Sequence, residues 1–81
     1  MIKDVRTTRI PIDESTVQVT TLLMSSTFTS EDQAETVKME MLRDLYETPQ
    51  LLLSGGKPFE RLEFFRSGSQ WIIRLDALVD A

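Results

Sequence analysis

Residues 70–79 read QWIIRLDALV, and this stretch decides the fold. From Trp71 onward every second side chain is apolar, so an extended chain would have one wholly apolar face and one mixed face. A period of two is typical of a β-strand that rests one face on a core. We therefore predict a strand here, although Asp76–Ala81 also fits a helix. The side chains expected to point inward are Trp71, Ile73, Leu75, Ala77 and Val79.

A shorter alternating run lies before this strand. Leu62 and Phe64 alternate with more polar neighbours, and Ser67-Gly68-Ser69 separates the two runs. Glycine adopts positive φ angles without steric cost, so this tripeptide suits a tight turn. These features predict an antiparallel hairpin over residues 58–79. Its two strands are expected at Phe59–Arg66 and Gln70–Val79.

The first third of the chain predicts another hairpin, over residues 2–24. Thr16–Met24 is rich in β-branched residues, which favour strands. Ile2–Ile12 is less regular, but its composition also favours extended structure. Pro11 has no backbone donor, so its strand should lie at a sheet edge or end there. The second strand should turn one face to the core, formed by Val17, Val19, Thr21 and Leu23.

An amphipathic helix is expected over residues 30–47, between the two hairpins. Ser30 stands three residues before Gln33, the spacing of a capping box in which each side chain bonds to the backbone N–H of the other. Thr48-Pro49 should end the helix, because the residue before a proline avoids helical geometry. Residues 48–57 then form a connector, in which Thr48 could cap a short second helix. The predicted apolar stripe consists of Ala34, Val37, Met41 and Leu45, widened by Met39, Leu42 and Tyr46.

These elements predict one α+β domain over residues 1–81, in the order ββαββ. The simplest way to bury both apolar faces is to lay the helix on one face of an antiparallel sheet. The other face of the sheet would then meet either solvent or a partner.

The side chains expected on that other face are more apolar than a solvent face requires. Phe65, Ile72 and Leu78 all project there if the hairpin follows its alternation. Three large apolar residues in such a position suggest cover, either from Leu51-Leu52-Leu53 or from another chain. The candidate protein-binding residues are Phe65, Ile72, Leu78 and Arg74, with Met39 and Tyr46 beside the helix stripe as secondary candidates.

Composition removes most catalytic chemistry. The 81 residues include no histidine, cysteine or asparagine, which excludes a Ser-His-Asp triad, a Cys-His pair and an ordinary zinc site. We expect no enzyme activity, no cofactor and no metal site. The absence of cysteine fits a reducing compartment such as the cytoplasm. No apolar run exceeds three residues, so we expect neither a signal peptide nor a membrane-spanning helix.

The charge distribution leaves two further binding functions open. The net charge of -4 weighs against nonspecific nucleic-acid binding. Residues 30–50 carry six acids against two bases, whereas residues 51–75 carry four bases against two acids. The acidic helix could imitate nucleic-acid phosphates and so block a DNA- or RNA-binding protein. The hairpin at residues 57–74 could bind single-stranded nucleic acid through Arg61, Arg66, Arg74, Phe59, Phe65 and Trp71.

The leading hypothesis is a small non-catalytic protein-interaction module. It would act as an adaptor, or as an inhibitor or regulator of a larger protein. Binding would use the open sheet face or a sheet edge, and the chain could also pair with itself as a homodimer. We expect neither nucleic acid nor membrane as its main partner.

Overall fold

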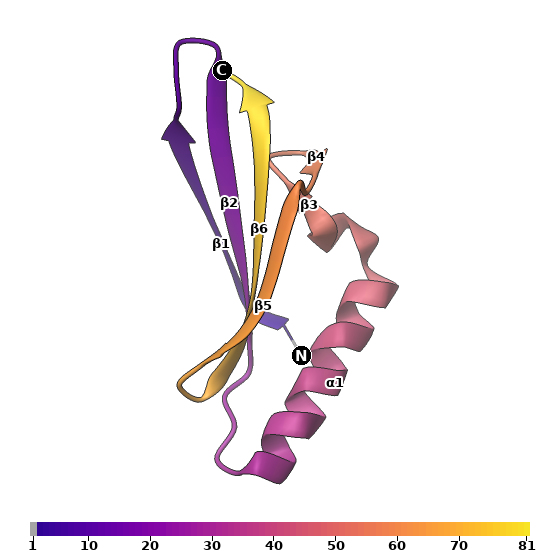
Figure 1. The fold of residues 1–81 in the computed structure, drawn as a ribbon. Helices are drawn as coiled ribbons and strands as arrows, with labels where there is room; N and C mark the ends of the chain where they lie inside the picture. Colours follow the sequence, from indigo (N-terminus) through magenta and orange to yellow (C-terminus); the bar gives the residue numbers. More distant parts are fainter. Residues whose placement is uncertain (1) are drawn as a thin grey trace.

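The computed structural model describes residues 2–81 and shows an antiparallel sheet with one helix along one of its faces (Figure 1). The predicted α+β class is therefore confirmed. Four strands pair in the order β1-β2-β6-β5, and each pairing is antiparallel. The strands are β1 (Ile2–Pro11), β2 (Thr16–Ser25), β5 (Arg61–Ser67) and β6 (Gln70–Asp80), and the helix is α1 (Glu31–Glu47).

The main core lies between α1 and the two central strands. Leu23 of β2 pairs with Ile73 of β6, and both side chains are buried. Met41 and Leu45 of α1 join them in one apolar cluster. Alternate residues of β6 are buried from Ile73 onward, as the period of two predicts. The strand continues to Asp80, so the helical alternative for Asp76–Ala81 is wrong.

β1 lies at one edge of the sheet and is largely open to solvent. Nine of its ten residues are exposed, because α1 packs mainly over β6 and β2. The strand ends at Pro11, as the missing backbone donor predicts. Asp13 shapes the following turn by accepting hydrogen bonds from the backbone N–H (2.8 Å) and hydroxyl (3.1 Å) of Ser15. These bonds, chiefly the backbone one, hold the pKa of the Asp13 carboxyl below its usual value.

α1 begins with the predicted cap but without the reciprocal bond of a capping box. The Ser30 hydroxyl accepts a hydrogen bond of 3.2 Å from the backbone N–H of Gln33. The prediction that the Gln33 side chain returns to Ser30 is wrong. Its Oε1 instead accepts bonds from the backbone N–H (2.8 Å) and the hydroxyl (2.7 Å) of Thr29. Thr29 offers two donors to this one oxygen, whereas Ser30 would offer only its N–H.

The apolar stripe of α1 is narrower than predicted. Its four central members are buried as expected: Ala34, Val37, Met41 and Leu45. Leu42 is partly buried and packs against the core. The other two predicted members are wrong, since Met39 is 62% exposed and Tyr46 is 87% exposed. Each helical residue advances by about 100°, which places these two side chains well outside the narrow buried stripe.

The connector forms a small second sheet that we did not predict. After a single 3-10 turn at Pro49–Leu52, β3 (Leu53–Ser54) pairs with β4 (Lys57–Pro58). Gly55-Gly56 joins them with φ angles of 62° and 81°, as a type I′ turn requires. Thr48 precedes the 3-10 turn, but its side chain makes no capping hydrogen bond within residues 2–81. The short second helix considered above is therefore reduced to one 3-10 turn.

The β3–β4 hairpin is fastened to the helix side of the main sheet (Figure 1). The buried Ser54 hydroxyl donates a hydrogen bond of 2.9 Å to the Val19 carbonyl, and it lies 2.9 Å from the Thr21 hydroxyl. A Cβ atom on Gly55 would meet Val19 Cγ2 at 2.8 Å and Val79 Cγ1 at 3.1 Å. The connector therefore covers the inner face of β2 and β6 around Val19 and Val79, while β1 stays open.

Candidate protein-interaction face

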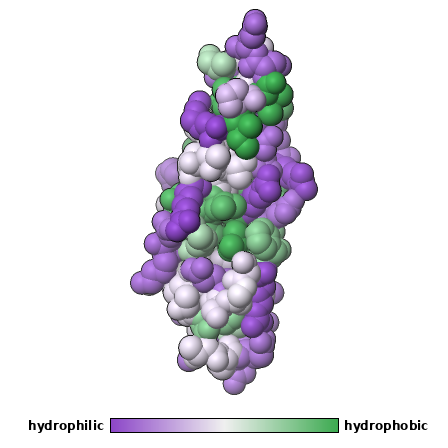
Figure 2. Space-filling model, turned by 90° about the vertical axis from the view of Figure 1, so that its left-hand side faces the viewer, coloured by the Kyte–Doolittle hydropathy of each residue, from purple (hydrophilic) through white to green (hydrophobic). Residues whose placement is uncertain are grey.

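The four-stranded sheet has one uncovered side, which we call the outer face. It consists of the side chains that alternate with the buried ones and point away from α1. Figure 2 looks at the molecule from this side. The outer-face residues are Asp4, Arg6, Thr8 and Ile10 of β1, Gln18, Thr20, Leu22 and Met24 of β2, Arg61, Glu63 and Phe65 of β5, and Ile72, Arg74, Asp76 and Leu78 of β6.

Apolar side chains gather at two places on the outer face. Met24, Ile72 and Phe65 lie side by side on three neighbouring strands, because Ile72 pairs with both of the others. Met24 is only 9% exposed, so Ile72 and Phe65 supply the accessible surface of this group. Leu78 lies toward the other end of β6 and is 47% exposed, while Phe65 is 39% exposed. Figure 2 shows hydrophobic atoms in separate groups on this side, with hydrophilic atoms between them. The predicted outward placement of Phe65, Ile72 and Leu78 therefore holds in the structure.

Two apolar neighbours on β2 were missed. Leu22 pairs with Arg74, and Met24 pairs with Ile72, so both belong to the outer face. The same alternation that assigned Leu23 to the core could have placed them there. Ile10 of β1, which is 48% exposed, adds to the apolar surface near the end that carries Leu78.

The connector does not cover the outer face. Leu51 and Leu52 pack against the core cluster on the helix side of the sheet. Leu53 belongs to β3, where it pairs with Pro58 and is 39% exposed. The intrachain cover considered for the outer apolar residues, from Leu51-Leu52-Leu53, is therefore not formed.

A charged belt separates the two apolar groups. Arg74 Nε lies 3.3 Å from the Asp76 carboxylate on β6, and Arg61 forms an ion pair with Glu63 on β5. The strand register sets Arg61 opposite Asp76 and Glu63 opposite Arg74. These four side chains therefore form a square in which each charge has opposite charges as its neighbours.

Asp76 is held in its ionised form within this square. Partial burial acts to raise its pKa, and this is the largest single influence. Hydrogen bonds from the Thr20 hydroxyl (2.6 Å) and from Arg74 act in the other direction, together with the charge of Arg61. The combined effect lowers the pKa of Asp76 below its usual value.

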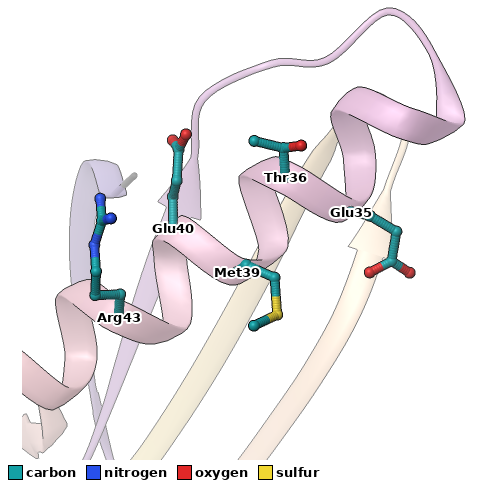
Figure 3. A pocket seen from close by; sticks show the side chains of 5 residues that line it. All are labelled: Glu35, Thr36, Met39, Glu40 and Arg43. Carbon is teal, nitrogen blue, oxygen red and sulfur yellow. The ribbon is translucent and has the colours of Figure 1, made fainter.

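Met39 lies on the opposite layer of the molecule, away from the outer face. It borders a shallow depression on the solvent side of α1 with Glu35, Thr36, Glu40 and Arg43. Figure 3 shows Thr36, Glu40 and Arg43 directed to one side of the helix, and Glu35 and Met39 to the other. The five side chains do not converge on a common point, so this depression has no geometry suited to a specific ligand.

Tyr46 also lies in the helix layer, beside a shallow apolar groove of about 260 Å³. The groove runs between the end of α1 and the start of β5. Its lining residues are Leu42, Leu45, Tyr46, Leu52, Phe59 and Leu62. The six residues predicted for protein binding therefore divide into four on the outer face and two on α1.

The basic and aromatic residues of the second hairpin are not brought together. Trp71 packs on the helix side, where its Nε1 donates a hydrogen bond of 2.8 Å to the Ala34 carbonyl. Phe59 lines the groove on the same side, whereas Phe65 lies on the outer face. Each of the three arginines is paired with a carboxylate, namely Arg61 with Glu63, Arg66 with Glu31 and Arg74 with Asp76.

Arg66 joins β5 to the start of α1. Two of its nitrogen atoms donate hydrogen bonds of 2.9 Å to the two carboxylate oxygens of Glu31. The guanidinium also stands 4.8 Å from the centre of the Phe28 ring. The Arg66 bond and charge lower the pKa of Glu31. These contacts were not predicted from the sequence, because only the folded chain brings Phe28 and Glu31 to Arg66.

Residues 2–81 contain no cluster of three or more acidic side chains placed to hold a metal ion. None of the helices in this described part of the chain is long and apolar enough to cross a membrane. Comparison with protein-family models, curated proteins and solved structures gives no match. The candidate site therefore depends on the geometry of the outer face alone.

Proposed function

We propose that this chain is a small non-catalytic protein-interaction module of the cytoplasm, an adaptor or regulator that binds a protein partner through the outer face. The observation that carries the proposal is the pair of accessible apolar side chains Ile72 and Phe65, level with the buried Met24 on three neighbouring strands, on a sheet face that Leu51 and Leu52 do not cover. Grouped apolar side chains in such a position are typical of protein contact sites.

The outer face is suited to binding because it is already ordered. Its side chains stand on paired strands, so little backbone entropy is lost when a partner docks. Apolar area stabilises a complex by about 25 cal/mol for each Å² removed from water. The charged side chains between the apolar groups have partners within the chain, which reduces the free energy needed to desolvate them.

The two alternative functions have less support. Single-stranded nucleic-acid binding needs exposed rings beside arginines that are free to meet phosphates. Trp71 packs against α1, and Arg61, Arg66 and Arg74 each contact a carboxylate. For the acidic helix as a nucleic-acid mimic, no contact or cavity on α1 favours binding over an ordinary solvated face.

The experiment compares affinity capture by the unmodified chain with capture by three variants. Ile72→Ser and Phe65→Ser should each reduce recovery of a partner protein about tenfold, since each removes an apolar contact worth over 1 kcal/mol. Met39→Ser is the matched control, because Met39 is exposed and lies on the other layer. The proposal fails if the partner is recovered equally with all three folded variants.

A further inference from the structure

The outward side chains of β6 follow a pattern that is complementary to its own reverse. Ile72, Arg74, Asp76 and Leu78 present an apolar group, a cation, an anion and an apolar group. If this row is turned end to end and laid on itself, apolar groups meet apolar groups and each charge meets its opposite.

The outward charges of the neighbouring strand β5 are also complementary to their own reverse. Arg61 stands level with Asp76, and Glu63 stands level with Arg74. When β5 of a second copy is laid on β5 in the reverse direction, Arg61 of one copy faces Glu63 of the other. Opposite charges therefore meet on this strand too. One twofold axis produces these pairings on both strands. It lies between the two stacked sheets, perpendicular to the strands and level with Leu75.

We propose that the partner of the outer face is a second copy of this chain, related by that twofold axis. Ile72 then faces Leu78 of the second copy, Arg74 faces Asp76 of the second copy, and Arg61 faces Glu63 of the second copy. The inference rests on the proposed function, because it names the partner of the same face. Two sheets stacked in this way form an aligned sandwich with a spacing of about 10 Å.

The central charges can enter this interface with their hydrogen bonds intact. Asp76 accepts a bond of 2.6 Å from Thr20 and a second from Arg74 within its own chain. Burying a charge costs less when it keeps its ion-pair and hydrogen-bond partners than when it loses them. In the dimer the Arg74–Asp76 pair of one copy lies against the Asp76–Arg74 pair of the other. Four charges of alternating sign therefore meet.

The size of the outer face indicates a weak, reversible dimer. Four strands spaced by about 4.8 Å, with about 3.4 Å per residue along them, offer roughly 500 Å² from each copy. Stable specific interfaces bury about 800 Å² on each side. The expected dissociation constant is therefore micromolar, and the dimer should be populated mainly at high protein concentration.

The test uses two single substitutions and their mixture. Arg61→Glu places an acid over Glu63 of the second copy, and Glu63→Arg places a base over Arg61 of the second copy. Either variant alone should dimerise about tenfold more weakly than the unmodified chain, because two like-charge contacts replace two attractive ones. In an equal mixture, the acidic and basic variants become complementary and should form a mixed dimer. Sedimentation equilibrium measures all four samples from micromolar to millimolar concentration.

Arg43→Glu and Glu47→Arg are the matched controls, because they make the same charge changes on the exposed side of α1. Neither control should alter dimerisation, and mixing them should have no effect. Circular dichroism verifies the fold of every variant. If a charge variant unfolds, Leu78→Ser replaces it, and this substitution should also weaken the dimer about tenfold.

The inference is overturned if the unmodified chain stays monomeric throughout the concentration range. It is also overturned if it dimerises but the mixture shows no recovery, since another surface must then form the contact. Partner capture that depends on Ile72 would survive either result, so the proposed function and the identity of the partner are tested separately.

Discussion

The indole Nε1 of Trp71 donates a hydrogen bond of 2.8 Å to the backbone carbonyl of Ala34, which joins the start of β6 to α1. The rings of Phe28 and Phe64 lie 6.2 Å and 5.3 Å from the Trp71 ring, centre to centre. This contact fixes which side of β6 faces the helix. Because side chains alternate along a strand, it also fixes the side on which Ile72 is presented to a partner.

Replacing Trp71 with phenylalanine should reduce the free energy of unfolding by about 1–2 kcal/mol, since the hydrogen bond to Ala34 and part of the ring packing are lost. Tyr46→Phe serves as the control, because Tyr46 is 87% exposed and should change stability by less than about 0.5 kcal/mol. Urea denaturation measures both variants. Equal stability of the two would show that the Trp71 contact does not secure α1.

The two glycines of the β3–β4 turn should respond differently to alanine. Both have positive φ, so each substitution carries a backbone penalty of about 1 kcal/mol. A Cβ atom on Gly56 would meet open space, whereas a Cβ atom on Gly55 would lie 2.8 Å from Val19 Cγ2. Gly55→Ala should therefore destabilise the fold about 1–3 kcal/mol more than Gly56→Ala in thermal or urea unfolding. An identical loss for both would contradict the close packing of Gly55.

The ion pair between Glu31 and Arg66 should give the fold an acid-sensitive component. Arg66 lowers the pKa of Glu31 in the folded chain, so the pair stabilises the fold above the unfolded pKa of the acid. That contribution is lost as the pH falls through the lowered value. Glu31→Gln should therefore be less stable than the unmodified chain at neutral pH and equally stable in strong acid, where the Glu31 carboxyl is protonated.

Unfolding curves at a series of pH values, at low and high salt, measure this difference. Both side chains are accessible to solvent, so added salt should reduce the difference at neutral pH. If the difference in unfolding free energy between the unmodified chain and Glu31→Gln persists unchanged in strong acid, Glu31 stabilises the fold through something other than its charge.

Adjacent isoleucines on β6 should differ sharply in their effect on stability. Ile73 is 1% exposed in the core, and Ile73→Ala should destabilise the fold by about 2–5 kcal/mol. Ile72 lies on the outer face, and Ile72→Ala should cost roughly 1 kcal/mol or less in a dilute, monomeric sample. Chemical denaturation at low concentration compares them. A larger loss at Ile72 would place that residue in the core and remove it from the binding face.

Local sequence patterns predicted those parts of the fold that depend on a single kind of interaction. Alternation along residues 70–79 identified the buried side of β6, and the Ser30 hydroxyl caps α1 as its position indicates. The width of the apolar stripe of α1 was overestimated by adding Met39 and Tyr46, because residues beside a stripe enter the core only if the sheet reaches them. The β3–β4 hairpin was missed since Gly55 and Ser54 owe their places to contacts with Val19, far away in the sequence.

The candidate site was partly predictable in the same way. Phe65, Ile72 and Leu78 follow from alternation, and Leu22 could have been found by extending it to β2. The square of charges could be predicted only from the exact pairing of residues between β5 and β6. The predicted ends of the two strands do not determine that pairing. Ser67 pairs with Gln70 in the structure, which leaves a two-residue loop with Gly68 at a φ of 57°. A shift of one residue would move Glu63 away from Arg74 and reverse the faces of β5.

The most direct measurement replaces Phe65 with a photoreactive phenylalanine analogue in the native cell and identifies what becomes covalently attached on illumination. The same analogue at Met39, which is 62% exposed on the helix layer, provides the comparison. The account predicts a discrete protein adduct from position 65, whether a second copy or another chain, and little from position 39. Equal labelling at the two positions, or no adduct at position 65 in a correctly folded chain, would contradict a binding role for the outer face.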